Sequence, residues 1–393
     1  RMSDTRAALR ALLFGNFAIG VGVMVVPGML GDLALGLAVS VPSAGQLIAL
    51  AAFVTSVGAP LAAATTSRID RRTLLVGALL FYTAGHVACA FAPGYGSLAV
   101  LRAFTVVSAA VFTPQAAATI ALMVPPAQRA GAVSAIFLGW SVASVLGMPL
   151  GNLIGAHLGW RWGFGAAALL AALGTAWVAR TIPAGLAVPS LSAAAWREVA
   201  GNRVLIGLLG VTLVSAAGQF TVIAYVAPAL SAATQASPAL VAGVLALFGG
   251  FGVIGNALMA RRIGRLGPDR AVAISLAAIV IGIGFAMAVT VALAFARPLL
   301  WPLLFAACLF WGLGCFAMNS AQQARLAAIA PPLASASIAL NTSCMYGGQA
   351  LGAALGGALI GAFGMGVLPW AAAALLSASL VASSRLRAVR APR

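Results

Sequence analysis

Long apolar runs recur along the whole chain, and this recurrence restricts the possible folds more than any other feature. Each run has about 18 residues or more, enough for a helix to cross a hydrocarbon core of about 30 Å. A helix also satisfies its backbone hydrogen bonds within itself, as lipid requires. Only 7% of the 393 residues are charged, against about 25% in soluble domains. We therefore predict an all-α polytopic membrane protein.

The apolar runs divide into twelve predicted spans, six in each half of the chain. They lie at approximately 9–33, 43–65, 73–93, 97–123, 131–157, 162–181, 204–230, 238–260, 271–295, 298–323, 334–361 and 366–384. No small-residue cleavage site follows the first apolar run, so we expect that span to be retained. The longest stretch between spans predicts a linker at 182–203, between six-helix bundles at 1–181 and 204–393.

Arginine placement predicts the orientation. All 22 basic residues are arginine. Under the span assignment all but three lie on one side; Arg161 and Arg297 lie on the other, and Arg102 lies inside a span. We therefore expect an inner membrane protein, and the positive-inside rule predicts that both termini and the linker lie on its cytoplasmic side. Anionic lipid headgroups account for the net charge of +17, so we expect lipid contacts and no nucleic-acid partner.

The reactive residues are too few for most catalytic sites. The chain has five acidic residues and two histidines, and no Walker A or GxSxG sequence. Its four cysteines all lie in spans without a CxxC pair, which favours packing roles over metal binding or disulfides. We therefore expect neither an enzyme nor a metal or cofactor site.

Glycines mark an internal repeat and two packing faces. Gly58 and the arginines after it reappear with similar spacing at Gly252 and beyond. Such a half-length repeat is typical of two-bundle transporters. Small residues four apart let helices approach closely in lipid, and proline bends a helix. We expect the two stripes to meet as a gating seam between the halves, with tight packing and no gating role as the alternative. They comprise Gly147, Pro149, Gly151 and Gly155 in span 5, and Gly348 and Gly352 in span 11.

Several stretches resemble one transporter family. The segment GWSVASVLGMPLGNLIGAHLGWRWGF is similar to the fifth-helix antiporter signature of the major facilitator superfamily. The segments VGAPLAAATTSRIDRRTLL, SLAVLRAF and NSAQQARLAAIAP resemble its twelve-helix drug:proton antiporter family, in particular the arabinose/sugar-efflux branch. The resemblance implies two pseudo-symmetric bundles, alternating access and proton antiport.

The loop between spans 2 and 3 departs from that family's pattern. The superfamily motif has an acidic residue where this chain has Ser67. Only Asp70 can offer a carboxylate to Arg68, Arg71 and Arg72. The resemblance implies a cytoplasmic latch at this loop; the alternative is a plain basic loop on the positive side.

Polar side chains within spans are costly unless they are paired or face water. We therefore treat a set of them as substrate-cavity candidates, with interhelical hydrogen bonding as the alternative for each. The set is Asn16, Gln115, Trp140, Gln219, Tyr225, Trp311, Asn319, Asn341 and Tyr346. No acid joins them, which disfavours polycations and favours neutral or weakly amphipathic solutes.

Proton coupling needs a group that gains and loses a proton during the cycle. No Asp or Glu lies midway through a span, and the candidates are Asp32, His86 and Arg102. We expected Asp32 to be held ionised if it lay beside Arg102 or a helix end. For Arg102 we expected an interior position, with snorkelling to the interface as the alternative.

Together these features predict a secondary transporter that works as a monomer and exports small neutral or amphipathic solutes such as drugs, sugars or nucleosides. Proton coupling is what the resemblance implies. A facilitator or importer, a non-transporting membrane sensor and a membrane-embedded lipid-transferring enzyme are the alternatives.

Overall fold

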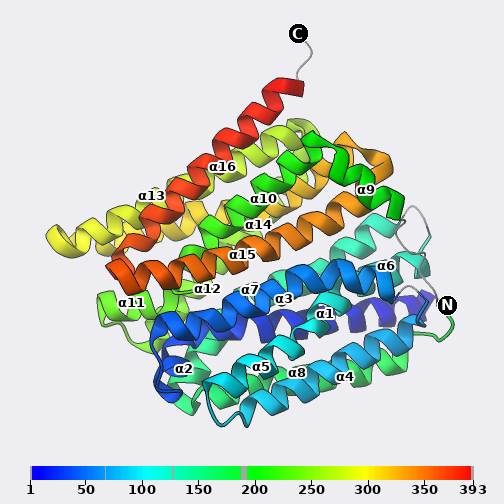
Figure 1. Cartoon of the computed structure of the whole chain (residues 1–393), viewed down its shortest axis with the longest axis horizontal. Coiled ribbons are helices and arrows are strands. Elements are labelled where there is room, and N and C mark those ends of the chain that lie inside the picture. Colours follow the sequence, from blue (N-terminus) through cyan, green and yellow to red (C-terminus); the bar gives the residue numbers. More distant parts are fainter. Residues whose placement is uncertain (1, 67, 126–127, 187–192, 391–393) are drawn as a thin grey trace. The chain divides into compact units, whose positions relative to one another are not determined.

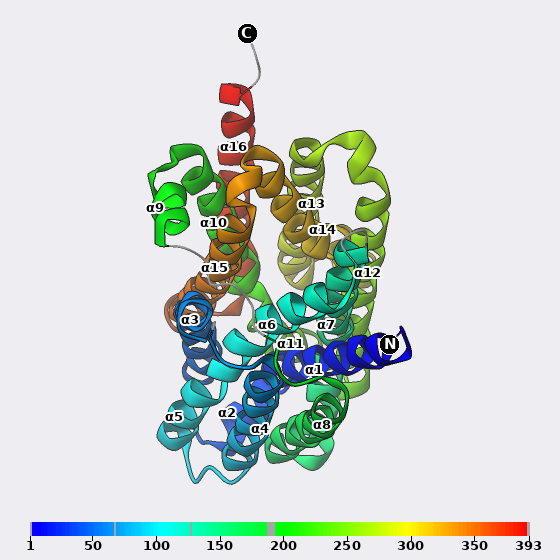
Figure 2. The same cartoon turned by 90° about the vertical axis from the view of Figure 1, so that its right-hand side faces the viewer.

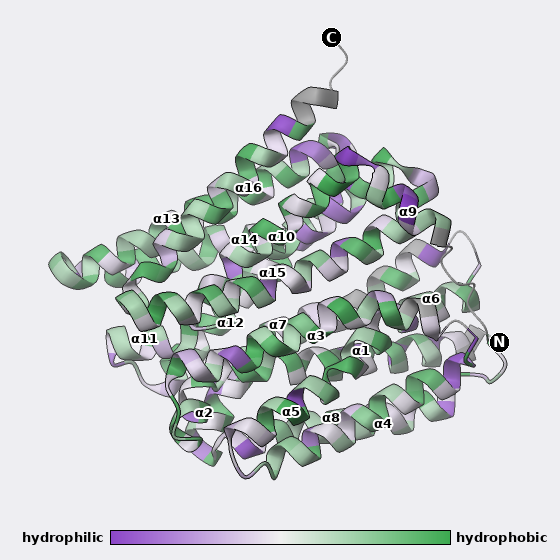
Figure 3. Cartoon of the chain, in the orientation of Figure 1, coloured by the Kyte–Doolittle hydropathy of each residue, from purple (hydrophilic) through white to green (hydrophobic). Residues whose placement is uncertain are grey.

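Helices form all the regular structure in residues 2–66, 68–125, 128–186 and 193–390, the ranges that this computed structural model describes (Figure 1). Ser67 and residues 187–192 of the predicted linker lie outside these ranges. Hydrophobic residues dominate along the helices (Figure 3). Large apolar side chains such as Phe53, Leu80 and Ile254 are exposed, as expected of surfaces that face lipid rather than water.

Eleven segments of the described chain are long and apolar enough to cross a membrane. They are formed by α1 (Met2–Gly28), α3 (Val41–Thr65), α4 (Arg71–Ala90), α5 (Tyr95–Thr105) with α6 (Val107–Met123), α7 (Arg129–Leu158), α8 (Trp160–Thr181), α10 (Arg203–Ile223) with α11 (Val226–Thr234), α12 (Pro238–Leu266), α13 (Pro268–Phe295), α14 (Leu300–Ile329) and α16 (Leu368–Arg390). Another helix, α15 (Ala334–Phe363), has 30 residues but more glycine and polar side chains. These helices correspond to the twelve predicted spans.

Three predicted spans are interrupted. The first was expected to continue to residue 33, but α1 ends at Gly28 and a short helix, α2 (Leu30–Gly36), follows. Pro27 lacks a backbone donor and Gly28 has poor helix propensity, so the helix is weak at this point. The fourth span is divided at Val106 and the seventh at Ala224–Tyr225. Outside the spans, α9 (Ala193–Gly201) precedes α10.

The chain separates into two compact units. Unit 1 comprises residues 1–40 and 54–191, and unit 2 comprises residues 41–53 and 192–393, so α3 contributes to both. In unit 1, α1 packs against α7 and α8, and α4 packs against α8. In unit 2, α13 packs against α14 and α10 against α15 (Figures 1 and 2). Each unit therefore has its own set of closely packed helix pairs.

The glycine stripe of α7 faces α1. A Cβ atom placed on Gly147 would lie 2.6 Å from the Cβ of Met24, and one on Gly151 would lie 3.0 Å from the Cα of Val25. A Cβ on Gly155 would lie 2.8 Å from the Cβ of Met29. The stripe was expected to pack against the other half, but it packs on a helix of its own unit. Glycine permits this contact because it lets two helix backbones lie this close.

The stripe of α15 is used in the same way. A Cβ on Gly348 would lie 2.7 Å from the Cβ of Ala216, and one on Gly352 would lie 2.9 Å from the amide nitrogen of Thr221. Both neighbours belong to α10, again within one unit. The α1–α7 and α10–α15 pairs are therefore equivalent close-packed seams of the two halves.

We predict that Gly151→Leu destabilises unit 1, because its side chain would collide with the backbone of α1. Overpacking costs about 1–3 kcal/mol, so the melting midpoint of the purified protein should fall. Gly77→Leu is the matched control, since Gly77 is an exposed helical glycine with open space at its Cβ position. Equal midpoints for the two variants would contradict the assigned packing.

Candidate functional site

Asn16 joins three helices inside unit 1. It is fully buried, its Nδ2 donates to the carbonyl of Ile136 over 2.9 Å, and its Oδ1 accepts from the Thr113 hydroxyl over 2.7 Å. These bonds connect α1 to α7 and α6. A donor and an acceptor are both occupied, so the geometry favours a role in holding the helices together over the expected role in a substrate cavity.

Arg102 lies inside unit 1, at the C-terminal end of α5, with 1% of its surface exposed. Its Nη1 donates to the Gly22 carbonyl on α1 over 3.2 Å, and the guanidinium lies 5.7 Å from the centroid of the Phe164 ring. Among the described residues its Nε has no hydrogen-bond partner. The expected interior position thus matches the geometry, with a backbone carbonyl and an aromatic ring as neighbours.

His86 shares this environment. Its Nδ1 lies 3.0 Å from the carbonyl of Tyr82, whose hydroxyl donates to the Ile19 carbonyl over 2.9 Å. A Cβ placed on Gly22 would lie 2.7 Å from His86 Nε2. Gly22 therefore lets the histidine and the arginine approach the same turn of α1, which brings two of the three coupling candidates together.

Asp32, the third coupling candidate, lies elsewhere in unit 1. It is half-buried in the first turn of α2, and its Oδ2 would lie 2.7 Å from a Cβ placed on Gly155. No ion pair joins it to an arginine among the described residues. Burial raises the pKa of Asp32 above its ordinary value of 3.8. No described arginine therefore holds this carboxylate ionised, and its place at the N-terminal end of α2 does not outweigh the effect of burial.

The loop before α4 is held by Asp70. Its carboxylate caps the helix by accepting from the Thr73 amide and hydroxyl, both over 3.1 Å. It also accepts from the amides of Gly185 over 2.6 Å and Leu186 over 3.1 Å. These hydrogen bonds lower the pKa of Asp70, and the bond from the Thr73 amide has the largest effect. The bonds from Gly185 and Leu186 therefore connect the loop to the chain after α8.

The arginines beside Asp70 differ in exposure. Arg71 is buried; its Nη1 donates to Gln115 Oε1 over 2.6 Å and its Nη2 to the Thr66 carbonyl over 3.1 Å. Arg68 and Arg72 are exposed. Gln115, expected in the substrate cavity, thus accepts a hydrogen bond from a loop arginine.

Two polar pairs lie in unit 2. Trp311 Nε1 donates to Gln219 Oε1 over 3.1 Å. Asn341 accepts from the Thr212 hydroxyl over 2.5 Å and donates to Asn319 Oδ1 over 3.4 Å. Within the described chain no partner is recorded for the amide NH₂ groups of Gln219 and Asn319. These two side chains therefore retain unused amide donors.

The remaining aromatic candidates differ in their surroundings. Tyr225 is buried, donates to the Ala353 carbonyl over 2.6 Å and lies against Gly45, all within unit 2. Tyr346 is buried and Trp140 is half-buried. The hydrogen bond of Tyr225 favours a packing role.

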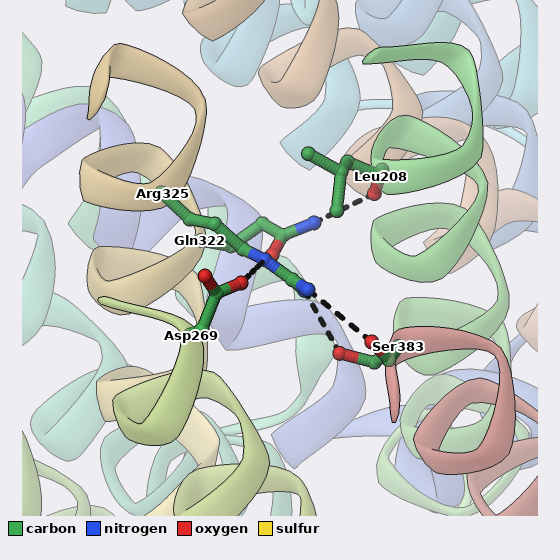
Figure 4. Close-up of polar contacts among 5 residues, drawn as sticks. All are labelled: Leu208, Asp269, Gln322, Arg325 and Ser383. Carbon is green, nitrogen blue, oxygen red and sulfur yellow. Dashed lines mark hydrogen bonds and ion pairs between the residues drawn. The ribbon is translucent and has the colours of Figure 1, made fainter. Parts of the chain in front are cut away.

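Sequence reasoning missed an ion pair in unit 2 between a buried arginine and a half-buried aspartate (Figure 4). Arg325 on α14 is 1% exposed and pairs through Nε with Asp269 Oδ1 on α13 at 2.5 Å. Its Nη1 and Nη2 donate to the hydroxyl and carbonyl of Ser383 on α16, over 2.8 and 3.2 Å. Gln322, one turn earlier, donates to the Leu208 carbonyl on α10 over 2.6 Å. The only sequence signal was an arginine close to the end of a predicted span.

These two helical units, with buried polar groups among long apolar helices, define a membrane transporter of the two-bundle class. The sequence profile of the Major Facilitator Superfamily matches residues 12–286. The inner membrane transport protein YdhP of Escherichia coli K12 is 32% identical over 90% of this chain and 89% of its own length. The chain belongs to the Major Facilitator Superfamily, and it is a transporter rather than an enzyme.

Two other comparisons extend this result. A probable sugar efflux transporter of Mannheimia succiniciproducens is 26% identical over 94% of this chain and 91% of its own length. The crystal structure of a D-xylose-proton symporter superposes with a TM-score of 0.73 and 17% identity, over 97% of this chain and 96% of that one. At this identity the structural likeness shows the fold alone.

We predict that Arg325→Ala destabilises unit 2 by about 1–3 kcal/mol, the usual cost of leaving buried hydrogen-bond partners unpaired. It leaves Asp269 and Ser383 without their shared partner and disconnects α13, α14 and α16. Arg270→Ala is the control, because Arg270 is exposed beside Asp269. Thermal unfolding in detergent measures both, and comparable midpoints would show that the contacts of Arg325 contribute little.

Proposed function

We propose that the protein exports small neutral or weakly amphipathic solutes from the cytoplasm by alternating access, with both termini cytoplasmic. The observation that carries the proposal is the pair formed by Gln219 and Trp311, with Asn319 in the same unit. An indole ring offers a stacking surface, and the free amide donors suit hydroxyl and carbonyl acceptors. None of these residues is acidic, so nothing in the set favours a polycation.

The name of one relative supports the direction and the solute class. The Mannheimia protein is named a probable sugar efflux transporter. A facilitator or importer is the second candidate, because the similar D-xylose-proton symporter fold shows that the same architecture is found in a symporter. Flux measured in both directions separates the two.

The experiment begins with a thermal-shift screen of the purified protein against sugars, nucleosides and antibiotics. The stabilising compound is then used in proteoliposome flux. We predict that Gln219→Leu weakens its binding about tenfold, the effect of losing one hydrogen bond with a partner left unpaired. Gln128→Leu, at an exposed glutamine, should bind as the wild type does. Equal affinity in the Gln219 variant would remove this residue from the site.

For proton coupling we propose Asp32 together with His86. Burial without a recorded arginine partner raises the pKa of Asp32, so its carboxyl holds a proton at a higher pH than an ordinary aspartate. Lowering the pH on the side to which Asp32 is open should therefore favour the protonated form. Arg102 stands close to His86 and adds a fixed positive charge beside it.

We predict that solute flux driven by an imposed pH gradient is lost in the double variant Asp32→Asn/His86→Gln, since neither replacement titrates. Glu198→Gln is the control, because Glu198 is an exposed acid on α9. A double variant that responds fully to the gradient would exclude these residues as the coupling site. Wild-type flux that ignores the gradient would favour a facilitator.

A further inference from the structure

Four exposed arginines gather where α12 turns into α13. Arg261, Arg262 and Arg265 occupy the last turns of α12, and Arg270 lies in the first turn of α13. The first three lie on one face, because positions three and four apart are neighbours on a helix. Gly267, with φ of 76°, reverses the chain between the two helices. The turn therefore presents exposed arginines from the ends of both helices.

The charge of this turn is not neutralised locally. Asp269 is the one acidic residue in 238–295. Its carboxylate pairs with the buried Arg325 on α14 instead of with the exposed arginines, and Figure 4 shows it directed at that guanidinium. In the described chain nothing lies within 4 Å of a Cβ atom placed on Gly264 or Gly267, and the four arginines around them are exposed.

The depth of the turn relative to the bilayer suits a phosphate ligand. With 29 residues, α12 is about 43 Å long, whereas the hydrocarbon core is about 30 Å thick. Its last turns therefore extend into the headgroup layer. Arginine binds phosphate through paired N–H donors and is less strongly hydrated than lysine.

We propose that the α12–α13 turn is a binding site for the phosphate of an anionic phospholipid headgroup, formed by Arg261, Arg262, Arg265 and Arg270. The matching turn of unit 1 is the weaker competitor. It exposes Arg68 and Arg72, while Arg71 is buried on Gln115 and the ionised Asp70 lies between them. The α12–α13 turn therefore exposes more arginines than the matching turn of unit 1.

The test compares the intact protein in nanodiscs of phosphatidylcholine alone and with added phosphatidylglycerol. The wild type should melt at a higher temperature with phosphatidylglycerol and should retain it in native mass spectrometry. Arg262→Gln/Arg265→Gln should lower that lipid affinity about 30-fold and lose the melting shift. Arg262→Lys/Arg265→Lys keeps the charge and should retain a large part of both.

The control Arg68→Gln/Arg72→Gln should keep the shift. Equal losses in this variant and the α12–α13 variant would reduce the site to general attraction by basic loops and overturn the proposal. A further arm offers glycerol phosphate to the protein in detergent. Saturable binding that displaces phosphatidylglycerol would overturn the lipid assignment in favour of a soluble phosphorylated ligand, whereas no displacement supports it.

Discussion

Close backbone approach between glycine-faced helices determines how each unit is built. In lipid, apolar side chains gain little by leaving one apolar environment for another, so helices associate through packing and hydrogen bonds. Gly147, Gly151 and Gly155 bring α7 onto the backbone of α1. This contact sets where the other side chains of α1 can reach. The bonds of Asn16 to Ile136 and Thr113 depend on the same arrangement.

Each unit has a buried arginine that connects helices, but the arginine lies on a different span in each. In unit 1, Arg71 at the start of α4 donates to Gln115 on α6, and Asp70 holds the chain after α8. In unit 2, Arg325 at the end of α14 connects α13 to α16. The third, fourth and sixth spans are thus linked near one end in each unit. The arginine lies on the third span of unit 1 and on the fourth span of unit 2. Sequence comparison of the halves therefore does not reveal the equivalence.

The sequence was sufficient for the helices and insufficient for side-chain partners. Apolar length alone predicted the twelve spans, since lipid permits few alternatives to a helix. It did not predict the break after Gly28, which places Asp32 on a separate short helix. Nor could spacing separate residues that hold helices together, such as Asn16, from residues with free donors, such as Gln219. That distinction depends on which carbonyls and hydroxyls lie opposite, and these come from distant parts of the chain.

The buried guanidinium of Arg102 gives unit 1 a fixed positive potential that no described carboxylate offsets with an ion pair. Two unit charges 10 Å apart repel by about 1.7 kcal/mol at an effective dielectric constant of about 20. An organic cation passing at that distance would therefore be disfavoured about 15-fold relative to a neutral molecule of the same shape. For any solute that came this close to Arg102 inside unit 1, the guanidinium would raise the energy of a cation and leave that of a neutral molecule nearly unchanged.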